Sequence, residues 1–89
     1  MNQIVSSFGT TVRQLREALG WSQEALAEHA DLNRSYIGEL EHGQAIASLL
    51  TLAKLSLALG VSLSNLMAQT ERIAQTRTVS GIELTAIAC

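Results

Sequence analysis

Apolar residues recur along the chain at intervals of three and four positions, which is the spacing of one face of an α-helix. Glycines stand where several of these patterns stop, and glycine is the residue that most often ends a helix. The pattern therefore predicts short helices joined by tight turns. The stretches that show it are 7–19, 23–30, 34–41, 49–59 and a last one from 63 to about 72.

Four of these stretches begin with the same two-residue signal, an apolar residue followed by Ser or Asn. The polar side chain can accept hydrogen bonds from the unpaired N–H groups of the first helical turn. The apolar side chain before it can pack on the fourth residue of the helix. The signals are Trp21-Ser22, Leu32-Asn33, Ala47-Ser48 and Val61-Ser62. Together with the first stretch, these four starts predict five helices and therefore an all-α fold.

The second and third predicted helices are separated by only three residues, 31–33. Two helices joined so closely must cross sharply, which is a helix-turn-helix arrangement. The third helix is expected to bury Ile37 and Leu40 and to expose Arg34, Ser35 and Glu39. Such a short polar face fits a DNA major groove, which is about 12 Å wide.

The character of the chain changes beyond about residue 75. Apolar residues there sit among Thr, Ser and Gly, and positions 82–85 alternate between apolar and polar. Two interpretations stay open: a short strand paired with its symmetry mate in a dimer, or a frayed tail. The expected organisation is one domain over residues 1–74 and a C-terminal tail over 75–89.

Composition narrows the function classes. The chain has 89 residues, enough for one domain, and a net charge of −2, which is unfavourable for binding nucleic acid. Cys89 is the only cysteine, and neither His29 nor His42 has a partner at metal-ligand spacing. The serines at helix starts are explained as caps. We therefore expect no enzyme, no metal and no cofactor.

No apolar run approaches the roughly 20 residues that cross a bilayer, and the N-terminus lacks the pattern of a secretion signal. The expectation is a cytoplasmic protein without a membrane partner. Nothing in the sequence indicates a small-molecule effector.

Three motifs together carry a family resemblance over roughly residues 6–67. They are Ser-Gln-Glu-x-Leu-Ala at 22–27, Ile-x-x-Leu-Glu-x-Gly at 37–43 and Leu-Gly-Val at 59–61. With them the chain resembles the Cro/phage-repressor (Xre-like) helix-turn-helix family. The resemblance implies a five-helix lambda-repressor-like bundle. It also implies a DNA-binding transcriptional regulator, of repressor or controller type, that reads a pseudo-palindromic operator as a homodimer.

The resemblance also implies roles for individual residues. Gln23, at the start of the second helix, matches a glutamine that contacts a phosphate, and Tyr36 and Arg13 are further candidates for the DNA backbone. Arg16 and Glu41 match an ion pair that joins the first helix to the end of the third. The candidate base-reading residues, near the start of the third helix, are Asn33, Arg34, Ser35 and Glu39.

Two features depart from a simple single-chain regulator. The segment 44–48 lacks the basic residues that the family often carries there, so phosphate contacts should be few. Leu50 and Leu57 lie off the stripe that faces the core, and either the fifth helix, the tail or a second protomer covers them. The residues predicted for a dimer interface are Leu50, Leu57, Leu66, Ile82 and Leu84. The competing interpretation is a protein-interaction module of the same fold, antitoxin-like or an adaptor.

Overall fold

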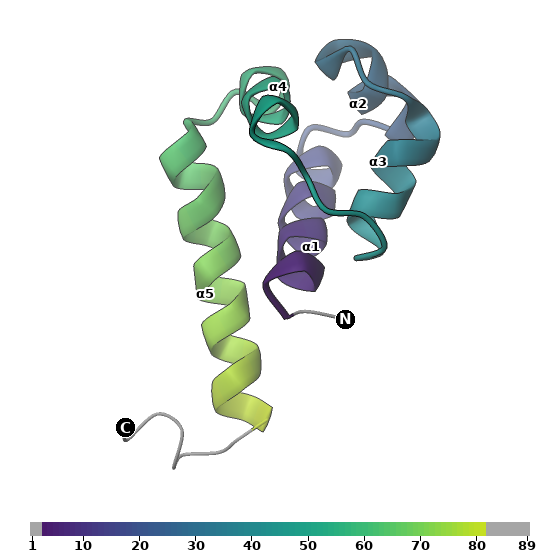
Figure 1. The fold of residues 1–89 in the computed structure, drawn as a ribbon. Coiled ribbons are helices and arrows are strands. Elements are labelled where there is room, and N and C mark those ends of the chain that lie inside the picture. Colours follow the sequence, from purple (N-terminus) through teal and green to yellow (C-terminus); the bar gives the residue numbers. More distant parts are fainter. Residues whose placement is uncertain (1–2, 82–89) are drawn as a thin grey trace.

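The computed structural model describes residues 3–81, with side chains through residue 76. Across that range the chain forms five α-helices and no strand, which confirms the predicted all-α fold (Figure 1). The predicted strand at 82–85 lies outside the described residues. The helices are α1 (Gln3–Ala18), α2 (Gln23–Ala30), α3 (Arg34–Glu41), α4 (Leu49–Leu59) and α5 (Leu63–Gly81).

Two helix ends differ from the prediction. α1 begins at Gln3 and not at Ser7, and Ser7 lies buried within the helix. Ile4 and Val5 extend the apolar stripe by a further turn, and both line a small apolar hollow together with Phe8. α5 continues to Gly81, so the expected boundary at residue 75 falls within a helix.

α1 lies at the centre of the bundle, with α5 along one side and α2 and α3 on the other (Figure 1). It packs against both α5 and α3, while α2 packs against α3 and α4. Aliphatic side chains from all five helices meet between them and exclude water, which is the main favourable term in folding. The buried hydrophobic residues are Phe8, Val12, Leu26, Ala27, Ala30, Ile37, Leu40, Leu55, Leu59 and Leu66.

The four predicted caps are confirmed. Ser22, Ser48 and Ser62 each accept a hydrogen bond from the backbone N–H three residues on, at 3.0, 3.1 and 3.0 Å. Asn33 Oδ1 accepts from the N–H of Ser35 at 2.8 Å. Each cap satisfies a donor that the helix leaves unpaired, which is worth about 1 kcal/mol.

The turn between α2 and α3 is closed by a residue in the left-handed conformation. Asp31 has φ 56° and ψ 51°, and the N–H of Leu32 donates to the carbonyl oxygen of Ala27 at 2.9 Å. Glycine is usual at such a position, because a Cβ is unfavourable there. The Asp31 carboxylate is 96% exposed and 3.8 Å from Lys54 Nζ, so this ion pair adds little stability.

Asp31→Gly is expected to stabilise the domain by about 0.5–1 kcal/mol, because glycine relieves the left-handed strain. The melting temperature, followed by circular dichroism, should rise by a few degrees in a domain of this size. Asp31→Ala is the control, since it removes the same charge but keeps a Cβ. An equal rise for both variants would show that charge and not backbone conformation governs this position.

α4 carries leucines on more than its core-facing side. Leu55 and Leu59 are buried, whereas Leu50 and Leu57, seven residues apart and on one face, are 66% and 83% exposed. We call Leu50 and Leu57 the leucine face. Among the described residues no single helix is long and apolar enough to span a bilayer; only α4 with the first part of α5, bent by 99°, reaches that length and composition as a pair.

Candidate nucleic-acid interface

The exposed side of α3 brings together the residues predicted to read bases. Arg34, Ser35 and Glu39 are exposed, and Ile37 and Leu40 on the opposite side are fully buried. A helix of eight residues is about 12 Å long, so the polar face is short enough to lie within a major groove. Asn33 is exposed next to this face, but its Oδ1 is already used to cap α3. Base contacts by these four residues stay a prediction.

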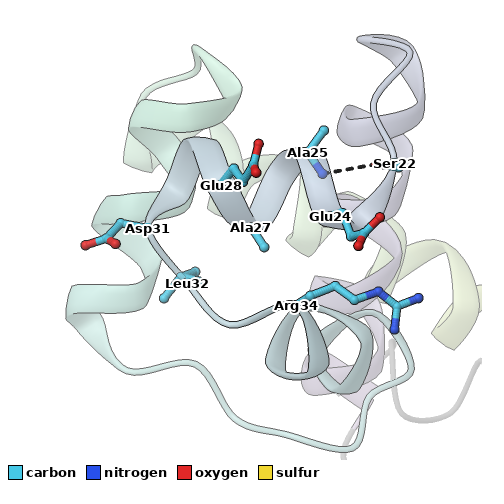
Figure 2. Close-up of a pocket in the computed structure, with 8 residues that line it drawn as sticks. All are labelled: Ser22, Glu24, Ala25, Ala27, Glu28, Asp31, Leu32 and Arg34. Carbon is cyan, nitrogen blue, oxygen red and sulfur yellow. Dashed lines mark hydrogen bonds between the residues drawn. The ribbon is translucent and has the colours of Figure 1, made fainter.

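An open groove of about 720 Å³ separates α2 from the start of α3. Glu24, Glu28 and Asp31 line it, with Arg34 at the end nearest Glu24 (Figure 2). Carboxylates repel phosphates, so this side of α2 is unfavourable for the DNA backbone. This acidic groove was not predicted from the sequence.

The N-terminus of α2 offers a different environment. Helix N-termini carry unpaired N–H groups and a partial positive charge, which together favour a phosphate. Gln23 is the first residue of α2, and its side chain is half-buried against α3. Gln23 therefore lies where the resemblance placed a backbone contact, although the contact itself is a prediction.

The ion pair expected between α1 and the end of α3 is present. Arg16 Nε donates to Glu41 Oε2 at 2.7 Å, and Arg16 NH2 donates to Glu41 Oε1 at 3.0 Å. The Glu41 side chain is 2% exposed and that of Arg16 is 11% exposed. Removal of one partner would leave a buried charge uncompensated, which is far more costly than loss of an exposed pair.

Two more hydrogen bonds extend this pair to the start of α2. Gln23 Nε2 donates to Glu41 Oε1 at 3.0 Å, and Arg16 NH1 donates to the carbonyl oxygen of Trp21 at 2.8 Å. The hydrogen bonds to Glu41 raise the pKa of Arg16 above its ordinary value, against the opposing effect of burial. The guanidinium is therefore charged at every pH at which such a fold persists. Neither additional bond was predicted, because both depend on how three helices meet.

The remaining backbone candidates differ in their surroundings. The Tyr36 hydroxyl donates to the carbonyl oxygen of Ile46 at 3.4 Å and lies 3.2 Å from Thr51 Oγ1, so it ties α3 to the following loop and α4. Arg13 is exposed on α1. Phosphate contacts by Tyr36 and Arg13 stay predictions.

Trp21 and His29 form a contact that was not predicted from the sequence. Their rings stack with centroids 4.0 Å apart and an interplanar angle of 12°. His29 is exposed, and its Nδ1 lies 2.8 Å from the carbonyl oxygen of Ala25. His29 lies in the last turn of α2, whereas Trp21 precedes the cap residue Ser22. The stack therefore helps to fix the start of α2.

Of the residues predicted for the dimer interface, one is buried and two lie outside the described part of the chain. Leu66 is fully buried within the protomer, because it faces the core from α5. The prediction that it contacts a partner is therefore wrong. Ile82 and Leu84 lie outside the described residues, so of the predicted interface residues the structure describes only the leucine face at the surface.

Comparison with known proteins agrees with this architecture. A family model described as helix-turn-helix matches residues 12–66. The control protein C.MunI from Mycoplasma sp. is 40% identical over 73 residues, which cover 81% of this chain and 99% of that protein. The control protein C.BamHI from Bacillus amyloliquefaciens is 43% identical over 67 residues, 74% of this chain and 83% of that protein.

A solved structure is also similar. The restriction-modification controller protein C.AhdI from Aeromonas hydrophila superposes with a TM-score of 0.68 at 44% identity, over 70% of this chain and 94% of that one. Sequence, fold and the geometry of α2 and α3 all lead to the same assignment. The chain belongs to the helix-turn-helix family, which is a family of DNA-binding regulators and not of enzymes.

Proposed function

We propose that this protein is a sequence-specific transcriptional regulator of the controller type that acts on double-stranded DNA in the cytoplasm as a homodimer. The observation that carries the proposal is the exposed polar face of α3 beside the capped N-terminus of α2. One element then reads bases while the other contacts a phosphate and sets the register. Relatives named control proteins, at 40% and 43% identity, support the controller type.

The chemistry of each side chain suggests its role on DNA. Arg34 can bond to guanine through two hydrogen bonds and Glu39 can accept from cytosine, while Asn33 and Ser35 are less selective. Gln23, Tyr36 and Arg13 are the candidates for phosphates. Because few Lys and Arg side chains are placed to neutralise phosphates and α2 bears an acidic groove, we expect the affinity for DNA to depend only weakly on salt concentration.

Dimerisation supplies the affinity that few phosphate contacts cannot. Half-sites one helical turn apart, about 34 Å, are read by two copies related by a two-fold axis. The leucine face is the surface we propose for this contact, because exposed leucines at one helical face indicate a partner.

A second candidate function is an interaction module that binds a protein in place of DNA. The acidic groove on α2 and the leucine face favour it, since both would suit a partner that is not DNA. Binding to the DNA upstream of its own gene separates the two. A dimer that shows no preference for any duplex over a random one would favour the interaction module.

Arg34→Ala is expected to lower affinity for the operator about tenfold or more, while affinity for random duplex changes little. The physical reason is that loss of a base contact affects only the matching sequence, at about 1–3 kcal/mol for a good bidentate pair. Fluorescence anisotropy of a labelled duplex measures both affinities. Arg72→Ala, which removes the same charge from an exposed position on α5, is the control. An equal effect of the two variants would mean that Arg34 contributes only its charge.

A further inference from the structure

The Gln23 side chain lies against two residues of α3 that are one turn apart, Gly38 and Glu41. Its Nε2 donates to Glu41 Oε1 at 3.0 Å. Its Oε1 lies 3.5 Å from the position that a Cβ on Gly38 would occupy. The amide oxygen therefore lies beside Gly38, at the separation of an ordinary van der Waals contact. The nitrogen end of the amide is therefore fixed by a hydrogen bond to α3, although Gln23 belongs to α2.

Glu41 is in turn held from α1. Its carboxylate accepts two hydrogen bonds from Arg16, and the Arg16 guanidinium also reaches the carbonyl oxygen of Trp21 at 2.8 Å. Trp21 and Gln23 flank the cap residue Ser22 on its two sides. The start of α2 is thus tied, before and after its cap, to a single ion pair at the end of α3.

We propose that Glu41 is a positioning residue for DNA binding that acts through Gln23. The amide nitrogen of Gln23 carries two hydrogens, and one of them is donated in the hydrogen bond to Glu41. The other is then directed to a phosphate together with the N–H groups of the α2 N-terminus. An amide that is already fixed loses no side-chain freedom when DNA binds, whereas a mobile glutamine would. The inference rests on the proposed function, because it requires DNA at this helix end.

The position of Glu41 also links the two tasks of the interface. Glu41 is the last residue of α3, whose other end is expected to read bases, and it holds the residue expected to contact the backbone. The position of Gln23 relative to the base-reading candidates at the start of α3 is therefore set through the Glu41 carboxylate. A change at Glu41 should alter binding without touching DNA.

The test is a double-mutant cycle on operator affinity with Glu41→Met and Gln23→Ala. Methionine is similar in length to glutamate but accepts no hydrogen bond from Gln23. We expect Glu41→Met to weaken operator binding about fivefold to tenfold in the wild-type background and less than about twofold in the Gln23→Ala background. Affinities are corrected for the folded fraction, measured by circular dichroism at the same temperature.

Glu17→Met is the matched control. Glu17 also lies near Arg16, at 4.0 Å, but its side chain is 62% exposed on α1. The control makes the same chemical change and the same change in net charge, and we expect it to leave operator affinity within about twofold of the wild type. If Glu41→Met weakens binding equally in both backgrounds, Glu41 acts only through the fold and the proposal is wrong.

Glu41→Met leaves Arg16 without its main partner and can reduce folding. The double variant Arg16→Met/Glu41→Met then takes its place, because it removes both charges and still deprives Gln23 of its acceptor. Side-chain amide relaxation measured by NMR on the DNA-free protein gives a second readout. Gln23 should be as restricted as the backbone in the wild type and mobile in the variant, with exposed Gln44 mobile in both. A mobile Gln23 in the wild type would overturn the proposal.

Failure of the proposed function looks different from failure of this inference. If the wild-type protein shows no preference for its operator, the regulator function fails, and the positioning role fails with it. If the wild type binds its operator but the cycle is additive, only the role of Glu41 is wrong.

Discussion

Replacement of Gly9 by alanine is expected to destabilise the fold strongly. α1 crosses the end of α3 at Gly9, where a Cβ would lie 2.7 Å from the carbonyl oxygen of Glu41 and closer still to that of Leu40. Both are backbone atoms of the last turn of α3, so α1 can relieve the clash only by moving away. We expect a loss of at least about 3 kcal/mol of unfolding free energy, the upper end of overpacking effects. Urea unfolding followed by circular dichroism measures it.

Gly38→Ala is the matched control for this effect. Both glycines lie inside helices, so alanine improves helix propensity by about 1 kcal/mol at either position. At Gly38 the added Cβ meets only Gln23 Oε1 at 3.5 Å, an ordinary contact. We expect the stability of Gly38→Ala to be unchanged or slightly raised. Equal losses for the two variants would mean that the close approach of α1 and α3 does not determine the stability at Gly9.

The second large effect is expected from Leu57→Glu. Leu57 is 83% exposed, so the protomer should fold normally with a glutamate there. In a dimer formed through the leucine face, two carboxylates would be buried close together, which is strongly unfavourable. We therefore expect a monomer in sedimentation velocity. Affinity for a two-half-site operator should fall by about 100-fold or more, because each half-site must then be bound separately.

Leu19→Glu serves as the control for oligomeric state, since Leu19 is also exposed, at 47%, but follows the end of α1 and does not belong to the leucine face. It should leave the sedimentation coefficient unchanged. A Leu57→Glu protein that stays dimeric would show that the dimer, if it forms, uses another surface. The acidic groove is not expected to be that other surface, because its carboxylates would repel those of a second copy.

Local signals in the sequence were sufficient to predict much of the fold. α2, α3 and α4 have the predicted bounds because their caps and closing turns are made by residues adjacent in the chain. The start of α1 was placed four residues too late, at residue 7, because the predicted apolar stripe began at Phe8 and left out Ile4 and Val5. The prediction for Leu66 on α5 was wrong, because a periodic apolar pattern indicates a buried helix face but not whether the same protomer or a partner covers it.

The candidate interface was predictable in position but not in its supporting contacts. The base-reading candidates follow from the start of α3, and the Arg16–Glu41 pair follows from the family resemblance. The bond from Gln23 to Glu41 joins residues 18 positions apart, and the acidic groove gathers side chains from α2 and the turn. The role of Gly9 depends on the separation of α1 from α3. These contacts exist only once the helices are packed, so no pattern along the chain reports them.

The measurement that tests the central claim most directly is titration of the wild-type protein with the duplex upstream of its own gene. A shuffled duplex of the same composition and length is the reference, and both titrations are made at physiological salt. The proposed regulator function predicts cooperative binding at least about a thousandfold tighter to the upstream duplex, within the range of specific regulators. Equal affinity for the two duplexes would contradict it.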